Sequence, residues 1–390
     1  MLRLSSIRQN FEQAFGYLDE GLRVFFAPGR VNLIGEYTDF TGGYVLPAAL
    51  TYGTWALVHQ RKDRKFRLAS TSFESRVEFD PSEIIYRRED GWANYPKGVI
   101  REFHELGVPL SGCDILFEGN VPKEAGLSSS ASIEMVTGIA LKQMNTIELS
   151  PITLARLAQR AENQFVGVNC GIMDQFASEM GQTDQAILLK CDTMDYHYIP
   201  LALGDYQFVI TNSNKQRNLR ESKYNERRKE CEEGIKLVRE YLPNTLCLGD
   251  VSVEQWKAVR RDIHPQEVFR RLEHVINENA RVVSSTIALE TGDLEKFGHF
   301  MMQSHESLRD LFEVTGTELD TLFDEARRVE GCIGTRMTGA GFGGCTVSLV
   351  HKDAVMGFEA QVTQRYLVKT GLIPTFYICS IGNGAREVKT

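Results

Sequence analysis

Cysteine and histidine are too few and too scattered to mark a zinc protein or a disulfide-stapled one. The 390 residues include 8 cysteines, none in a Cys-x-x-Cys pair, and 8 histidines, none in a His-x-x-x-His pair. These absences remove the usual zinc-ligand spacing and the helical zinc-hydrolase motif. A chain of this length also buries enough apolar surface to fold without disulfide cross-links. We therefore expect a reduced, cytoplasmic protein.

Long apolar runs and an excess of positive charge are missing as well. Residues 1–10 contain no apolar core of signal-peptide length. Residues 41–60 carry no formal charge, but they hold three glycines and a proline, so we expect a turn followed by buried strands rather than a membrane span. The 44 Lys and Arg against 52 Asp and Glu give a net charge of −8, which excludes a global basic field for nucleic acid or an anionic membrane.

The composition that is present belongs to an ordinary globular protein, with 42% hydrophobic and 25% charged residues. Its length exceeds the roughly 250–300 residues at which single cores stop growing. Strands and helices interleave without strict alternation, which predicts an α+β fold with two domains, residues 1–200 and 201–390. The pattern predicts strands at residues 24–28, 54–58, 114–119, 207–211 and 374–379, and helices after Ser128, from Ser150, at 222–240 and within 252–329.

Residues 28–43 form the first segment that could carry chemistry. Apolar neighbours draw Arg30, Glu36 and Asp39 inward, and buried charges need either an internal network or a polar ligand. Two carboxylates, a phenol and an arginine between glycines suit a ligand with many hydroxyl groups, such as a sugar. The alternative is an ordinary solvated turn.

Residues 121–132 form the second segment and lead straight into a predicted helix. A loop of Gly126, Leu127 and three serines in front of a helix offers backbone N–H groups and the positive end of the helix dipole, which is a phosphate-binding arrangement. The alternative is a serine-rich helix cap without a ligand, although three serines exceed what one cap uses. No Gly-Lys-Ser/Thr occurs in the chain, so this is not a Walker A loop.

Two further segments are ambiguous alone. Asp174 follows Cys170-Gly171-Ile172-Met173, where an aspartate is commonly a helix cap or a first-turn acid. Residues 339–344 satisfy Gly-x-Gly-x-x-Gly, but residues 346–350 predict a strand where a dinucleotide site needs a helix. The chain also lacks the His-Arg-Asp and Asp-Phe-Gly motifs of protein kinases. We therefore expect residues 339–344 to be a glycine-rich turn between strands that lines a cleft.

Taken together, these segments resemble the GHMP small-molecule kinases, and within them the galactokinase family. The resemblance covers most of the chain in the family's order, through residues 29–39, 126–132, 170–175, 224–228 and 339–344. It implies a kinase that uses ATP and magnesium to phosphorylate the anomeric hydroxyl of D-galactose, giving galactose 1-phosphate and ADP. It also implies an N-terminal domain like ribosomal protein S5 domain 2, a ferredoxin-like C-terminal domain and an active site in the cleft between them.

The resemblance assigns roles to individual residues. Asp174 is expected to be the general base for the anomeric hydroxyl, and Arg30 to stabilise the transition state beside it. Phosphoryl transfer depends mostly on positioning and on neutralising charge, which suits these two groups. The sugar ligands it implies are Glu36, Tyr37, Thr38, Asp39, Gly171, Asp174 and Tyr224. The ATP ligands are Ser70, Glu124, Ala125, Gly126, Leu127, Ser128, Ser129 and Ser130, and the magnesium ligands are Ser130 and Glu162.

Two positions depart from the family's pattern. The family usually has histidine where this chain has Tyr37, which is longer and cannot become cationic near neutral pH. It usually has glycine where this chain has Glu124, whose carboxylate would repel phosphates unless it points outward, with Lys123 as a candidate partner. A sister kinase of different sugar selectivity and a non-catalytic galactose sensor therefore stay open as alternatives.

Overall fold

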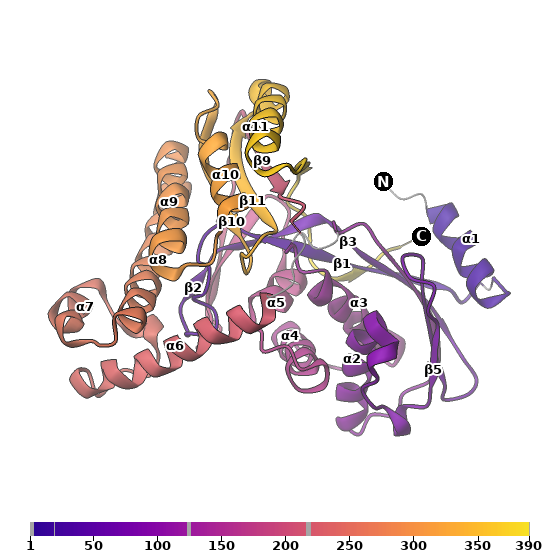
Figure 1. The fold of residues 1–390 in the computed structure, drawn as a ribbon. Coiled ribbons are helices and arrows are strands. Elements are labelled where there is room, and N and C mark those ends of the chain that lie inside the picture. Colours follow the sequence, from indigo (N-terminus) through magenta and orange to yellow (C-terminus); the bar gives the residue numbers. More distant parts are fainter. Residues whose placement is uncertain (1–3, 19, 123–125, 216–219, 390) are drawn as a thin grey trace.

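A computed structural model describes residues 4–18, 20–122, 126–215 and 220–389 (Figure 1). The predicted ATP ligands Glu124 and Ala125, with Lys123, lie outside this range. An α+β arrangement is present, as predicted, with two large sheets and helices packed on each of them.

The first sheet has six strands in the order β13-β1-β3-β6-β4-β5. Neighbouring strands are antiparallel except β4 and β6, which run parallel. The strands predicted at residues 24–28, 54–58 and 114–119 are all confirmed here as parts of longer strands. Their bounds are Arg23–Asn32 (β1), Pro47–Gln60 (β3), Phe66–Ser70 (β4), Val77–Phe79 (β5), Cys113–Gly119 (β6) and Arg386–Glu387 (β13).

Alternation along β1 and β3 sends side chains to both faces of this sheet. Phe25 enters a core shared with the helices at residues 94–105, 129–144 and 151–160, whereas its neighbour Val24 packs with Phe11 of the helix on the opposite face. The predicted helix start at Ser150 is confirmed, because its hydroxyl accepts the Thr153 N–H at 3.1 Å. The helices are Leu4–Phe15 (α1, opposite face), Asn94–Glu105 (α2), Ser129–Met144 (α3), Pro151–Arg160 (α4) and Met173–Met180 (α5).

The second sheet has four antiparallel strands in the order β10-β11-β9-β12. This is the strand order of a split β-α-β-β-α-β unit, so the ferredoxin-like expectation holds. Residues 339–344 form the turn between β10 and β11, as predicted. The strands are Tyr206–Asn212 (β9), Cys332–Thr338 (β10), Cys345–His351 (β11) and Thr375–Cys379 (β12), and helices Thr317–Ala326 (α10) and Val355–Thr370 (α11) cover one face.

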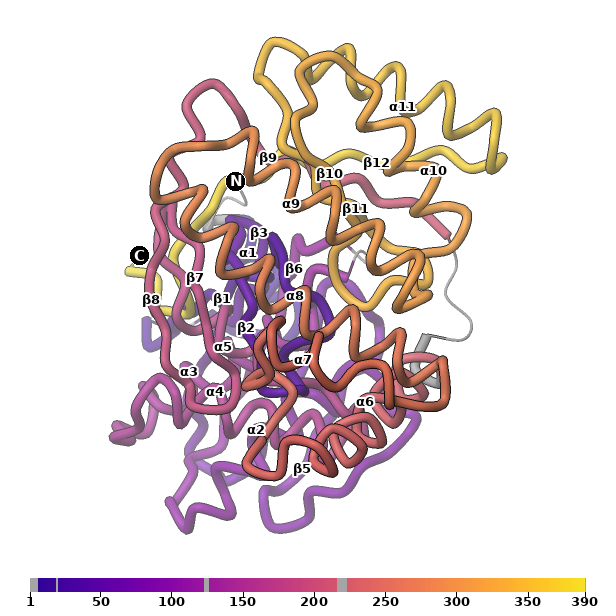
Figure 2. The backbone as a smooth tube through the Cα atoms, turned by 90° about the vertical axis from the view of Figure 1, so that its left-hand side faces the viewer, coloured from indigo at the N-terminus to yellow at the C-terminus, as the bar shows by residue number. Residues whose placement is uncertain are grey.

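The other face of the second sheet packs against the N-terminal half of the chain. Phe208 and Val347 of this sheet share one apolar core with Val31 and Leu46, which flank residues 33–44, and with Phe297. This shared core fixes the segment after β1 between the two sheets. Helix Gln266–Glu290 (α8) passes close to Tyr44–Val45 (β2) at the end of this segment (Figure 2). The other α-helices of the described ranges are Arg220–Tyr241 (α6), Val253–Val259 (α7) and Leu294–Ser307 (α9).

A small third sheet and the last strand complete the fold, and the last strand returns to the N-terminal sheet. The third sheet joins Tyr44–Val45 (β2), Gln185–Lys190 (β7) and Tyr196–Pro200 (β8), so residues 41–60 do form a turn followed by strands. The boundary near residue 200 stays a prediction, and β13 adds residues 386–387 to the N-terminal sheet. No helix in the described ranges combines the length and the apolar character of a membrane span.

Candidate active site

Arg30 and Asp174 face each other, although they are 144 positions apart in the chain. Arg30 lies in β1 just past an irregularity in its pairing with β3, and it is 4% exposed. Its Nε donates to Asp174 Oδ1 at 2.9 Å, and a second guanidinium nitrogen lies 2.7 Å from the same oxygen. The third nitrogen donates to the Gly126 carbonyl oxygen at 2.7 Å. One guanidinium therefore joins the predicted base to the predicted phosphate loop.

Asp174 lies in the first turn of α5, where an acidic residue is common in any helix. It also binds Arg30, so both interpretations of this aspartate apply. Its second carboxylate oxygen accepts the hydroxyl of Ser128. Ser128 sits at the N-cap of α3 in a left-handed conformation (φ 58°) and makes no side-chain hydrogen bond to that helix. Because the Ser128 hydroxyl is bound to Asp174, it does not accept a hydrogen bond from the backbone N–H groups at the start of α3.

The other serines of this loop have different surroundings. Ser132 is fully buried, and its hydroxyl donates to the Ala27 carbonyl oxygen at 2.8 Å, so it has a structural role. Ser129 is exposed, whereas the half-buried Ser130 hydrogen-bonds to Glu162. Leu127 is buried, so it turns its side chain away from solvent. The loop therefore offers a ligand mainly its backbone, together with Ser130.

Glu162 lies in a π-helical segment, Ala161–Val166, next to the serine loop. It is 5% exposed, and burial together with the negative charge of Asp174 raises its pKa to about 7. Gln175 donates to Glu162 Oε2 at 2.7 Å and to the fully buried Glu134 at 3.0 Å. Burial likewise raises the pKa of Glu134 well above its usual range. Among the described residues, this corner of the site thus brings together Glu134, Glu162 and Asp174, three carboxylates.

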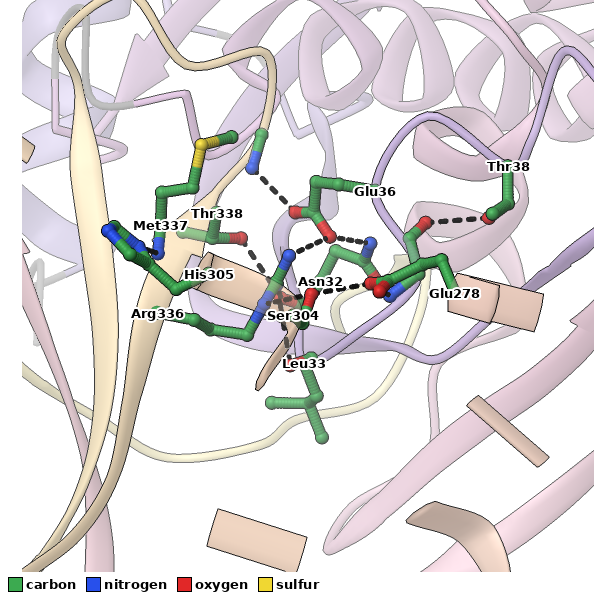
Figure 3. Close-up of polar contacts among 12 residues, drawn as sticks. Asn32, Leu33, Glu36, Thr38, Glu278, Ser304, His305, Arg336, Met337 and Thr338 are labelled. Carbon is green, nitrogen blue, oxygen red and sulfur yellow. Dashed lines mark hydrogen bonds and ion pairs between the residues drawn. The ribbon is translucent and has the colours of Figure 1, made fainter. Parts of the chain in front are cut away.

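Glu36 lies between the two halves of the molecule, where Figure 3 shows it among buried polar groups. It is 2% exposed and pairs with the fully buried Arg336, whose guanidinium lies 2.7 Å from Oε2. Asn32 donates to the same oxygen at 2.5 Å, and the Gly339 N–H donates to Oε1 at 2.7 Å. Burial raises the pKa of Glu36, although Arg336 and the Gly339 N–H oppose that rise. Buried Glu36 therefore has partners within the protein, which is one of the two possibilities expected for the charges of residues 28–43.

Asp39 and Gly171 are in close contact. A β-carbon added to Gly171 would lie 1.8 Å from Asp39 Oδ2, so only glycine leaves room for this carboxylate. Burial, reinforced by the negative charge of Asp174, raises the pKa of Asp39 to about 6. Thr38 is fully buried and donates its hydroxyl to the carbonyl oxygens of Gly35 and Tyr44, at 2.8 and 2.6 Å.

Tyr37 closes the site on the side of the C-terminal half. It has a left-handed backbone (φ 67°), and its hydroxyl donates to the Ala340 carbonyl oxygen at 2.6 Å. Its ring packs against Phe312 and Tyr224, with ring centroids 4.5 and 5.5 Å apart. Burial raises the pKa of Tyr224 well above its usual range, so that phenol stays protonated. Sequence reasoning had no signal for Phe312, since it lies outside every motif.

These groups surround a cavity of about 250 Å³. Four carboxylates line it, whereas Arg30 is the one Lys or Arg side chain among its described lining residues, so the cavity favours cations and hydroxyl donors. Thr38, Ser70 and residues 126–129 are not among the lining residues, and their predicted ligand contacts stay predictions. The predicted residues that line the cavity are Arg30, Glu36, Tyr37, Asp39, Ser130, Glu162, Gly171, Asp174 and Tyr224.

Helix α8 supports the segment that carries Glu36 and Asp39, residues 32–44, here called the sugar loop. Glu278 accepts the Gly35 N–H at 3.0 Å, and Asn279 accepts the Tyr44 N–H at 2.7 Å. Burial lowers the pKa of His274, which faces the Glu36 carbonyl oxygen, to about 4. Sequence reasoning missed these supports because charged and polar residues within a long helix give no signal of what they contact.

Three protein-family models match the chain. "Galactokinase galactose-binding signature" covers residues 9–60, "GHMP kinases N terminal domain" covers 94–182, and "GHMP kinases C terminal" covers 286–367. A galactokinase from Halalkalibacterium halodurans is 50% identical over 94% of this chain and 93% of its own length. One from Bacillus subtilis is 47% identical over 97% of both chains.

Solved structures give the same picture of the fold. Lactococcus lactis galactokinase in complex with galactose matches with a TM-score of 0.96 and 41% identity, over 99% of this chain and 100% of that one. A mevalonate kinase matches with a TM-score of 0.64 at 18% identity, over 92% of this chain and 99% of the other, which is a likeness of fold alone.

Proposed function

The chain belongs to the galactokinase family of GHMP kinases, and from this premise we propose that it transfers the γ-phosphoryl group of ATP to the anomeric hydroxyl of D-galactose. The products are galactose 1-phosphate and ADP. The observation that carries the proposal is the contact of Arg30 with both Asp174 and the Gly126 carbonyl oxygen, at 2.7 to 2.9 Å. This contact brings together groups that proton removal and phosphoryl transfer need.

Asp174 acts as the general base in this proposal. Its two oxygens accept hydrogen bonds from Arg30 and Ser128, an arrangement that matches the ionised carboxylate. It takes the proton of the anomeric hydroxyl while that oxygen forms a bond to the γ-phosphorus, and the bond from the γ-phosphorus to the β,γ-bridging oxygen breaks. A carboxylate in this role is worth roughly 10²–10⁴-fold in rate.

The serine loop and the start of α3 hold the ATP phosphates. Ser128 leaves the first N–H groups of α3 to a ligand, and these groups carry the positive end of the helix dipole. Arg30 stabilises the charge on the phosphoryl group in transit, because its guanidinium lies between the loop and Asp174. Ser70 stays a predicted nucleotide contact.

The donor set at Glu162 and Ser130 fits magnesium. Both offer oxygen ligands, which magnesium prefers, and a divalent cation would offset the burial and the Asp174 charge that raise the pKa of Glu162. When bound, the ion would neutralise phosphate charge. Gln175 holds the Glu162 carboxylate in place at 2.7 Å. A cytoplasmic location is part of the same proposal, and the eight free thiols support it.

Glu36, Asp39 and Tyr224 recognise the sugar. The two carboxylates accept hydrogen bonds from sugar hydroxyls, and the protonated phenol of Tyr224 supplies a donor at the cavity wall. Gly171 permits the position of Asp39. The contact of Thr38 with the sugar stays a prediction.

A sister kinase of different sugar selectivity is a second candidate, and Tyr37 is the observation that favours it. Its phenol occupies the cavity wall where the family usually has histidine, and its hydroxyl is bound to Ala340. A pocket shaped by this ring can prefer a relative of galactose, such as an N-acetylated hexosamine.

The experiment that separates the candidates is a panel of free sugars with magnesium and ATP, measured by ADP release. We expect galactose to give the highest kcat/KM, and the Tyr37→His variant to retain galactose activity. Weak galactose turnover beside a strong alternative sugar would replace the first candidate by the second. No turnover of any sugar, with galactose still bound, would indicate a sensor instead of an enzyme.

A further inference from the structure

Arg336 is a buried arginine directly behind the sugar loop, and none of the roles proposed above includes it. It belongs to β10 and is fully shielded from solvent. One guanidinium nitrogen lies 2.7 Å from Glu36 Oε2, and another lies 3.2 and 3.4 Å from the carbonyl oxygens of Asn32 and Leu33 (Figure 3). Its Nε donates to the Ser304 hydroxyl oxygen at 3.2 Å. Two of the three nitrogens are thus bound to residues 32–36, and the third is bound to Ser304 of α9.

Two groups close together in the sequence hold Glu36 by both of its oxygens. Arg336 binds Oε2, and the Gly339 N–H, three residues later, donates to Oε1 at 2.7 Å. A carboxylate held at both oxygens by one strand end cannot rotate unless that strand end moves. Since Glu36 also lines the cavity, the end of β10 sets the direction in which this carboxylate meets a ligand.

The same strand end touches the phosphate loop. A β-carbon added to Gly339 would lie 3.1 Å from the Gly126 carbonyl oxygen, so the two backbones approach closely. That carbonyl oxygen is also the one that accepts Arg30. A continuous series of contacts therefore runs from Glu36 through Gly339 and Gly126 to Arg30.

Ser304 and Glu278 connect Arg336 to the sugar loop by a second series of hydrogen bonds. Ser304, its neighbour on α9, donates to the buried Glu278 at 2.5 Å. The same Glu278 oxygen accepts the Gly35 N–H from the sugar loop at 3.0 Å. The loop is thus held from β10, α9 and α8 by groups that share partners.

We propose that Arg336 is a positioning residue for the reaction, which orients Glu36 toward the sugar and couples sugar binding to ATP binding through Gly339 and the phosphate loop. The proposal rests on the proposed function, because it needs Glu36 to bind the sugar. The geometry requires arginine, since a planar fork reaches Glu36, two carbonyl oxygens and Ser304 at once, whereas lysine offers a single nitrogen.

The first test is the variant Arg336→Lys, with Arg271→Lys as its matched control. Arg271 is also buried, at 2% exposure, and it is paired to Glu230 and Glu313, outside the cavity lining. We expect Arg336→Lys to raise the KM for galactose about tenfold or more and to reduce the rise in Tm that galactose causes. Arg271→Lys should lower the Tm without changing the KM for galactose.

The coupling is measured as the change in galactose Kd when a non-hydrolysable ATP analogue is added. We expect the analogue to tighten galactose binding in the wild type and to have a smaller effect in Arg336→Lys. In the Glu36→Gln background, adding Arg336→Lys should cost much less galactose affinity than it does in the wild type, because both substitutions act on one contact.

Additive effects of Arg336→Lys and Glu36→Gln on galactose Kd would overturn the proposal, as would equal shifts in the two arginine variants. If Arg336→Lys does not fold, Ser304→Ala removes the support of its Nε and should weaken galactose binding in the same direction, and an unchanged Kd there would overturn the proposal as well. A wild-type protein that does not bind galactose would instead end the proposed function.

Discussion

The sugar loop and the phosphate loop present their ligand groups in opposite ways. In the sugar loop, the buried Glu36 is fixed by an ion pair with Arg336, and the half-buried Asp39 by the close approach of Gly171. In the phosphate loop, the side chains of Ser128 and Ser132 turn to Asp174 and Ala27 and leave backbone groups for the ligand. The proposed function therefore assigns sugar selectivity to particular side chains and their partners, and phosphate binding to the path of the backbone.

The largest effect that tests this contrast is expected from Gly171→Ala. The added methyl group would lie 1.8 Å from Asp39 Oδ2, so the carboxylate must move. A displacement of this size should lower kcat/KM for galactose by about 10²-fold, with a smaller change in the KM for ATP. Gly119→Ala is the control, because its methyl group would meet the nearest atom at 3.6 Å. Equal losses for both substrates in Gly171→Ala would mean that the two loops are not distinct in this way.

A smaller effect is expected from the serines of the phosphate loop. Ser128→Ala removes a hydrogen bond to the Asp174 carboxylate and should lower kcat about tenfold while leaving the KM for ATP nearly unchanged. Ser129→Ala should change neither constant, because this exposed residue contributes its backbone. Steady-state kinetics with varied ATP measures both. A large rise in the KM for ATP in Ser129→Ala would show that side chains bind the phosphates after all.

The smallest effect is a pH dependence that belongs to the sugar loop. Burial, with Asp174 nearby, raises the pKa of Asp39 from its ordinary 3.8 to about 6. The ionised form accepts sugar hydroxyls, so at saturating magnesium and ATP the kcat/KM for galactose should be constant above pH 7 and fall severalfold as the pH drops through about 6. Asp39→Asn should remove this inflection and lower the plateau. An inflection that survives in Asp39→Asn would assign it to another group.

The sequence was sufficient for the elements that carry strong local signals. Pro151 after Ser150 marked the start of a helix, and the glycines of residues 339–344 marked a turn between strands rather than a dinucleotide site. Asp174 and Arg30 were expected to lie together, and they are 2.7 Å apart. Their motifs are short and contiguous, so each can be recognised without knowing the fold.

The remaining features depend on partners far away in the chain. Arg336 contacts Glu36 across 300 positions, and nothing near either residue indicates the pairing. Thr38 lies within the sugar motif, yet its hydroxyl is bound to backbone carbonyl oxygens, a direction set by the turn of the loop. Sequence motifs therefore indicated which segments meet, and the structure was needed to say which side chains face the cavity.

The central claim is that Asp174, held by Arg30, removes the proton from the anomeric hydroxyl of galactose. The measurement that tests it most directly compares Asp174→Asn with the wild type for both galactose turnover and galactose binding. We predict that kcat falls about 10²–10⁴-fold while galactose still raises the Tm, because asparagine keeps the size of the side chain and loses the base. Galactose turnover near the wild-type rate in Asp174→Asn would contradict the account.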